Sequence, residues 1–176
     1  MQQYPGYVDQ PGLQRAFAAA GIACWWEAGN FYVSDLAKAQ AVVAAYNPLA
    51  AVQAQASAQV QATLAGLLAA GFAIGSNAVA IDQTAQAEIG SLAILALATL
   101  GGQVTTPWPT GRTWPVVSGT PIPLTTPQDL IAVGGPCAHY VWSIKNYAIG
   151  LIAQIEAATT AAAVQAIDIT AGWPTS

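Results

Sequence analysis

The sequence predicts a mostly α-helical α+β fold in which helices are combined with short β-hairpins. Apolar residues recur every three or four positions over residues 49–70, and this period is typical of helices. Apolar runs flank Gly29–Asn30 and Gly75–Asn77, and this arrangement is typical of hairpins. With 55% hydrophobic and only 7% charged residues, the chain of 176 residues has ample material for a core.

Residues 1–48 are predicted to form a small α+β head. Leu13, Phe17 and Ala20 mark one face of a helix that ends at Gly21. Two strands around the Gly29–Asn30 turn follow, and then a second helix capped by Ser34 or Asp35. If residues 4–8 are also extended, the order is βαββα.

Residues 49–70 are predicted to form a connecting helix. Its apolar stripe is Leu49, Val52, Ala56, Val60, Leu64 and Leu67. The other faces carry glutamines, including Gln55 and Gln59, and no charge. Two interpretations stay open, a helix that lies on its own domain and a coiled-coil-like contact between subunits. Gln55 and Gln59 are therefore candidate interaction residues.

Residues 71–176 are predicted to form a helical domain with hairpins. Asp82 or Thr84 caps a helix that ends at Gly101–Gly102, and its apolar residues predict a buried helix. The Pro-rich residues 103–124 allow only short edge strands. The apolar residues of the helix that follows Asp82 are Ile89, Leu92, Leu95 and Leu100.

The last part of the chain is predicted to form a long helix and a short one. Pro127 suits the first position of the long helix. Thr159 or Thr160 caps the short helix, and Gly172 followed by Pro174 is expected to end it. Because so short a helix is marginal alone, it should fold back on the long helix. The expected contacts are Val164, Ile167 and Trp173, and Trp173 is predicted to pack on the helix that contains Ile152 and Ile155.

Composition argues against several classes of function. Four basic residues in a chain of net charge −4 cannot neutralise a run of phosphates, so nucleic-acid binding is not expected. Residues 89–100 are too short to span a bilayer, and no signal peptide is recognised. Two cysteines and one histidine cannot supply four zinc ligands. A Cys24–Cys137 disulfide is left open.

No catalytic constellation is predicted, and neither is a cofactor. Cys137 and His139 are two residues apart, so on a helix they point to different faces. Four carboxylates lie at or near predicted helix ends, where capping explains them. We therefore expect no enzyme activity. The four carboxylates near predicted helix ends are Asp82, Glu88, Asp129 and Asp168.

Tryptophans are the remaining candidates for binding. Trp25 and Trp26 are neighbours in a strand, so one of them must face outward. Trp108 and Trp114 flank the Pro-rich turn. An exposed tryptophan can stack on a sugar or anchor a protein contact, whereas packing under a loop is the alternative. Trp26, Trp108 and Trp114 are the candidate interaction residues from this group.

The order of these parts resembles a C-terminal domain of unknown function found in tail and tail-fibre-associated proteins of tailed bacteriophages. The resemblance begins with Asn47-Pro48-Leu49 before the Gln-rich helix and continues through the hairpin that ends at Asp82 and the Trp-containing turn. Its most specific element is the ending from Ile155 to Pro174, "IEAATTAAAVQAIDITAGWP". The resemblance covers about residue 48 to the end and brings no catalytic residues.

This resemblance implies a structural component of a phage tail, made in the bacterial cytoplasm and retained in the virion at the baseplate, tail tip or fibre. Its partners would be other tail proteins and further copies of itself, with a trimer as first choice. The neutral surface favours such contacts. The alternatives are a fibre-assembly chaperone that is not retained in the virion, or a module that binds a host glycan.

Overall fold

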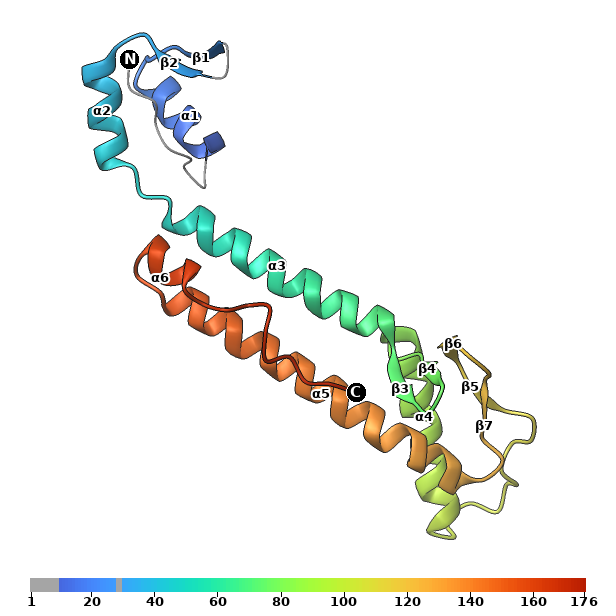
Figure 1. The fold of residues 1–176 in the computed structure, drawn as a ribbon. Coiled ribbons are helices and arrows are strands. Elements are labelled where there is room, and N and C mark those ends of the chain that lie inside the picture. Colours follow the sequence, from blue (N-terminus) through green and yellow to red (C-terminus); the bar gives the residue numbers. More distant parts are fainter. Residues whose placement is uncertain (1–9, 28–29) are drawn as a thin grey trace. The chain divides into compact units, whose positions relative to one another are not determined.

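The computed structural model describes residues 10–27 and 30–176 (Figure 1). About 59% of the chain is helical and 11% is strand, which confirms the predicted α+β class. The chain forms two compact units. The first contains the residues up to 58 together with 153–168, and the second contains 59–152 together with 169–176. The sequence-based division at 48/49 and 70/71 stays a prediction.

The first unit begins with two helices around a hairpin. Helix α1 (Gln10–Ala19) precedes strands β1 (Cys24–Glu27) and β2 (Asn30–Val33), which pair antiparallel, and α2 (Leu36–Ala45) follows. Gly21 has a φ of 70°, as a glycine that ends a helix commonly does. Asp35 caps α2 by accepting a hydrogen bond from the Lys38 N–H at 3.0 Å. The core consists of Leu13, Phe17, Ile22 and Ala39. The predicted extended segment 4–8 and the turn residues 28–29 lie outside the described residues.

The rest of the first unit joins the start of α3 (Leu49–Ala70) to the end of α5 (Pro127–Ala157) and to α6 (Ala161–Gln165). Val52, Ile155 and Val164 are buried here. Thr160 caps α6 by accepting from the Ala163 N–H at 3.1 Å. One detail of the prediction is wrong. Helix α6 ends at Gln165, well before Gly172, because Ala166 already serves as its C-cap.

The second unit contains two small antiparallel sheets and α4 (Gln83–Leu100). Strands β3 (Phe72–Ile74), β4 (Asn77–Val79) and β6 (Val116–Ser118) form one sheet in that order. Strands β5 (Thr113–Trp114) and β7 (Ile122–Pro123) form the other. Strands this short agree with the Pro-rich composition of the segment. Asp82 caps α4 by accepting from the Ala85 N–H at 2.9 Å.

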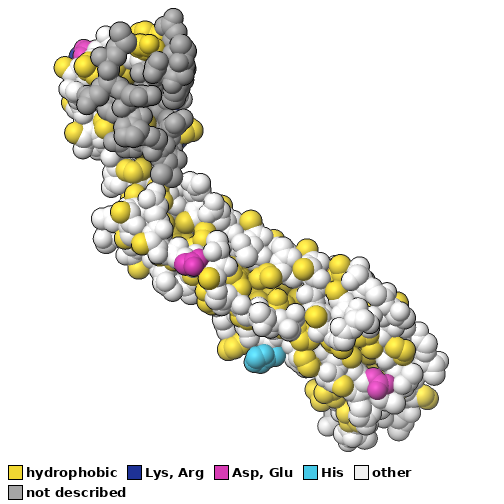
Figure 2. Space-filling model, in the orientation of Figure 1, with side chains coloured by type: hydrophobic (Ala, Val, Ile, Leu, Met, Phe, Trp, Pro, Cys, Tyr) yellow, Lys and Arg dark blue, Asp and Glu magenta, His cyan; other side chains and the backbone are white. Residues whose placement is uncertain are grey.

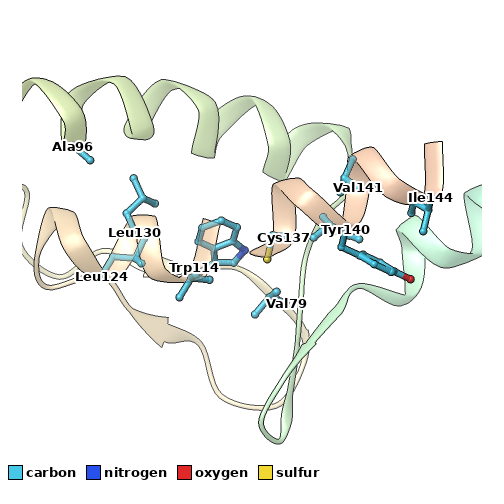
Figure 3. Packing of buried hydrophobic residues seen from close by; sticks show 11 residues of the cluster. Val79, Ala96, Trp114, Leu124, Leu130, Cys137, Tyr140, Val141 and Ile144 are labelled. Carbon is cyan, nitrogen blue, oxygen red and sulfur yellow. The ribbon is translucent and has the colours of Figure 1, made fainter. Parts of the chain in front are cut away.

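The core of the second unit is centred on Trp114, which is 1% exposed. Figure 3 shows its indole between Leu124 and Leu130 on one side and Cys137 on the other. Its Nε1–H donates to the Ala80 carbonyl at 3.2 Å, so the buried indole keeps a hydrogen bond. The predicted stripe of α3 also faces inward: Val60 is fully buried, and Leu64 and Leu67 pack against this core.

The C-terminal segment of the second unit packs on α5, as predicted, and Trp173 contacts Tyr147 of that helix. The rings of Trp173 and Tyr147 meet edge to face with centroids 5.2 Å apart. Tyr147 donates its hydroxyl hydrogen to the Ala171 carbonyl at 2.7 Å. Gly172 has a φ of 78°, and a Cβ there would lie 2.5 Å from the Tyr147 Oη. Glycine fits this position because it has no Cβ to collide with Tyr147 and because it adopts the left-handed conformation without strain.

Helix α4 is only partly buried, and the expectation of a buried helix is wrong. Ala85 and Ala96 are its buried residues, whereas Ile89, Leu92 and Leu95 are half-buried. Ile94 is 73% exposed, and Leu100 is exposed as well. The physical reason is that the apolar residues of this helix are distributed over several of its faces, whereas only one face packs on the core.

Candidate interaction surface

Two of the four predicted tryptophans pack inward. Trp114 is a core residue, so the prediction that it forms an interaction surface is wrong. Trp108 is half-buried, and its Nε1–H donates to the Leu124 carbonyl at 2.9 Å. Both indole N–H groups therefore bind backbone carbonyls of their own unit. This leaves packing under the loop, the alternative interpretation, as their role.

The hairpin of the first unit carries the other pair. Trp26 lies in β1 opposite Phe31 in the register, but the prediction for its side chain lies outside what the structure describes. Trp25 is 45% exposed and stacks on Tyr32, with ring centroids 5.8 Å apart. This stacked pair is an outward-facing aromatic surface.

The two candidate glutamines of α3 are both exposed, as expected for interaction residues. Gln53, two residues before Gln55, has a different role. Its side-chain amide donates to the backbone carbonyls of Ile155, Glu156 and Ala158 at 3.0, 3.3 and 3.1 Å. Ile155 and Glu156 belong to the last turn of α5 and Ala158 follows it, and the last carbonyls of a helix lack most of their internal donors. The Ile155 carbonyl also accepts a long hydrogen bond from the Ala158 N–H, at 3.3 Å.

A groove of about 590 Å³ lies in the second unit, between α4 and α5. The two helices run antiparallel. Gln86 near the start of α4 accepts a hydrogen bond from Lys145 in the second half of α5 at 3.2 Å, whereas Ile89, further along α4, lies beside Gly134 in the first half of α5. Trp114 closes the floor, and a Cβ added to Gly134 would lie 3.3 Å from its Cη2. Apolar or small residues form nearly all of the lining, including Ile89, Gly90, Ala93, Leu130, Gly135 and Ala138.

Large apolar side chains stand on the rims of this groove. Leu97 of α4 is 63% exposed, and Trp142 of α5 is 64% exposed. Ile94 and Ile149 extend the same apolar surface along the two helices. Figure 2 shows hydrophobic and uncharged side chains over most of the described surface in that view. Lys145 is the one charged residue among those that line the groove.

One thiol lies in the lining of the groove. Cys137 lines it but is 4% exposed, and burial raises the pKa of its thiol to about 11, so the nucleophilic thiolate is suppressed. His139 is exposed while Cys137 is buried, as the prediction of different helix faces requires. Cys24 and Cys137 are both free.

Two of the four carboxylates predicted near helix ends, Asp82 and Asp129, accept hydrogen bonds at helix N-termini. Asp82 caps α4, and Asp129 accepts hydrogen bonds at the start of α5 from the Thr125 hydroxyl and the Thr126 N–H, both at 2.7 Å. Among residues 10–27 and 30–176, no group of three or more His, Cys, Asp or Glu residues could hold a metal ion. Within the same residues, no helix is long and apolar enough to cross a membrane.

Sequence reasoning missed the exposed residues of α4 and α5, although a signal was present. On α5, positions 131, 135, 138, 142, 145 and 149 follow a spacing of four and three, so they form a second stripe beside the buried one. On α4, positions 87, 90, 94 and 97 do the same. For α4, apolar residues on both stripes predict a buried helix, whereas the structure leaves Ile94 and Leu97 exposed.

The fold and this surface define a class: a mainly helical α+β domain with an apolar groove between two antiparallel helices, a kind of surface that commonly serves contacts between proteins. Residues 51–171 match the family described as domain of unknown function DUF4376, and the chain belongs to that family. No curated protein and no solved structure matches the chain.

Proposed function

We propose that the protein is a structural component of a bacteriophage tail, located in the virion at the baseplate, tail tip or fibre, and that it acts through protein–protein packing without catalysis. The observation that carries the packing role is the apolar surface of α4 and α5, on which Ile94, Leu97 and Trp142 are exposed. Surfaces of this kind mark contact sites, because leaving large apolar groups in water is unfavourable.

The phage assignment rests on the sequence. The ending from Ile155 to Pro174 resembles the tail-associated domain described above. The structure gives this ending a physical purpose. Thr160 caps α6, Val164 is buried, and Trp173 packs on Tyr147. These three residues of the motif therefore support folding, which agrees with a role in packing.

The test is a quantitative mass-spectrometric inventory of purified, intact virions from the phage that encodes the chain. We expect the protein in a fixed copy number per particle, and in the tail fraction when heads and tails are separated. A protein that is abundant in infected cells but absent from virions would overturn the proposal in favour of the assembly chaperone.

A glycan-binding module is the second candidate, and one observation favours it. Trp25 is exposed and stacked on Tyr32, which leaves an aromatic face for a sugar. Trp108 and Trp114 no longer support this candidate, because both indoles bind inside their unit. Adsorption of the purified protein to host cells that is lost in Trp25→Ala would favour the glycan module over a purely structural role.

We also propose that the working state is a homo-oligomer, with a trimer as first choice, through the uncharged surface of α3. Gln55 and Gln59 are exposed, and amides cross a contact without the desolvation cost of a charge. In light scattering, Gln55→Glu together with Gln59→Glu should dissociate such a trimer while circular dichroism stays unchanged. An assembly whose mass ignores the double substitution would rule out this contact.

A further inference from the structure

We propose that the groove between α4 and α5 is a self-association site in which two copies of the chain pack about a two-fold axis, with Trp142 of each copy seated over Gly135 of the other. The proposal rests on the packing role given above but not on the virion assignment, because it concerns the purified protein in solution. It assigns a partner, a second copy of this chain, to a surface that the fold leaves uncovered.

The first argument is shape. Trp142 is a large side chain that stands 64% exposed on the rim, whereas Gly135 on the same stripe lacks a side chain and has open space around it. The two positions lie on opposite sides of Ala138, at nearly equal distance along α5. A two-fold axis close to Ala138 that pairs α5 antiparallel with its copy therefore brings each indole to the other copy's gap. The same patch supplies both partners, as a closed two-fold interface requires.

Small residues at the centre allow the helices to approach. Ala138 lies next to the axis, and Gly90 and Ala93 line the facing side of the groove on α4. Nothing lies within 4 Å of a Cβ built at Gly90 or Gly135, so both positions are open. A buried tryptophan in the centre of an interface, surrounded by smaller apolar contacts, is the usual pattern of an energetic hot spot.

Charge agrees with this arrangement. Lys145 is the charged residue of the groove lining, and a second copy brings its own Lys145. With the axis near Ala138, the two Lys145 side chains lie about 20 Å apart along the helices, at about 1.5 Å per residue. That separation exceeds the screening length of about 8 Å at physiological salt. The contact therefore creates no close pair of like charges.

The area is sufficient for a specific dimer. The stripe from Ile131 to Ile149 is about 27 Å long, and two helices side by side are about 20 Å wide. Each copy would therefore contribute on the order of 500 Å², or about 1,000 Å² in total, which meets the lower bound for a biological interface. A small apolar ligand on the groove floor would leave Ile94 and Ile149 in water, whereas a second copy covers these rims too.

The experiment measures mass by light scattering coupled to size exclusion at several protein concentrations. We expect this contact alone to give pairs of the 17.9 kDa chain, and together with a trimeric contact of α3 to give hexamers, so the mass is an even multiple in either case. Trp142→Ala removes the inserted side chain, and Gly135→Leu fills the gap that receives it. Each should weaken association at least tenfold, while circular dichroism stays native, because both positions face open space within the chain. Val117→Ala, at an exposed apolar residue of β6, is the matched control and should not change the mass.

A cysteine at the axis tests the geometry directly. In a Cys24→Ser background, Ala138→Cys should form a disulfide-linked dimer under mild oxidation, while Cys137 stays buried. Ala132→Cys, which is exposed on the same helix but far from the axis, should not do so. A wild type that remains monomeric, or an assembly unaffected by Trp142→Ala and Gly135→Leu, would overturn the proposal. A monomer stabilised by an added fatty acid would assign the groove to a small amphiphile instead.

The outcomes separate this inference from the proposed function. Dissociation by Trp142→Ala with no chain in purified virions would support the dimer and reject the tail assignment. A protein that is found in virions, and whose mass in solution changes only with the Gln55→Glu and Gln59→Glu pair, would support the tail assignment and reject the dimer.

Discussion

The side-chain amide of Gln53 on α3 donates a hydrogen bond to the backbone carbonyl of Ile155 on α5, at a distance of 3.0 Å. The same amide nitrogen also reaches the carbonyls of Glu156 and Ala158. One neutral side chain thereby donates hydrogen bonds to carbonyls at and just after the end of α5. Carbonyls at the C-terminus of a helix otherwise accept hydrogen bonds from water.

We expect Gln53→Ala to lower the free energy of unfolding by about 1–3 kcal/mol, because partly buried carbonyls lose their donor. This corresponds to a fall in Tm of about 2–4 °C per kcal/mol for a chain of this size. Gln55→Ala is the matched control: Gln55 is exposed on the same helix, and its removal should change stability by less than about 0.5 kcal/mol. Equal effects of the two substitutions in thermal melts would contradict the capping role.

Trp114 should be the most sensitive tryptophan of the chain's described part. Trp114→Ala removes a side chain from the centre of the core and should cost about 3–5 kcal/mol. Trp114→Phe should cost less, because the ring is kept and only the hydrogen bond to Ala80 and part of the volume are lost. Urea unfolding measures both. Trp108→Phe, at a half-buried indole, should have the smallest effect, and a reversal of this order would reject the assignment of the core.

Two glycines should respond in opposite directions to alanine. Gly172→Ala should destabilise the protein by about 2 kcal/mol or more, because the left-handed conformation disfavours a Cβ. The new atom would also press on Tyr147. Gly150→Ala should stabilise it by about 0.5–1 kcal/mol, since Gly150 is a helical residue with open space around it. Calorimetry of the two variants checks the signs, and a stabilising Gly172→Ala would be incompatible with the packing of the C-terminal segment.

Asp129 should make stability depend on pH in the acidic range. The Thr125 hydroxyl, followed by the Thr126 N–H, holds the pKa of its carboxyl below the ordinary value of 3.8. A group whose pKa is lower in the folded state stabilises fully above its unfolded pKa and loses this effect as pH falls through its folded pKa. We therefore expect the Tm difference between wild type and Asp129→Asn to be constant from pH 7 to about 5 and to shrink below about pH 4. A difference that grows on acidification would refute this linkage.

The two thiols should differ in reactivity. Burial raises the pKa of Cys137 to about 11, so at pH 8 almost none of it is thiolate, and the side chain is 4% exposed. Cys24 is only half-buried. A disulfide-exchange reagent should label one thiol per native chain and two in urea. In Cys24→Ser, the fast native reaction should disappear, and persistent labelling would place a reactive Cys137 at odds with its burial.

Local chemistry made much of the fold predictable from the sequence. Asp35, Asp82 and Thr160 were among the expected caps, and each accepts a hydrogen bond from the N–H three residues later. Pro127 begins α5, and Gly75 takes a φ of 60° in the turn between β3 and β4. Caps, turns and helix starts depend on neighbours within a few residues, so the sequence contains what decides them.

The candidate site was predicted less well, because exposure depends on which of several apolar faces finds a partner. Helix α4 has apolar residues on several faces, and nothing in its sequence reveals that Ile94 and Leu97 stay in water while Ala96 is buried. Likewise, Trp108 and Trp114 look like surface residues of a Pro-rich turn until the fold places their indoles against Leu124 and Ala80.

The sequence by itself therefore determined the class of fold, the ends of most helices and the lack of charge, since these follow from residue type and short-range spacing. Only the tertiary structure decided that Gln53 donates hydrogen bonds to carbonyls at the end of α5, and that Tyr147 approaches Gly172 closely. It also decided that a groove lies beside Trp142. Each of these depends on residues distant in the chain, and their meeting is fixed by the packing of whole helices rather than by any local preference.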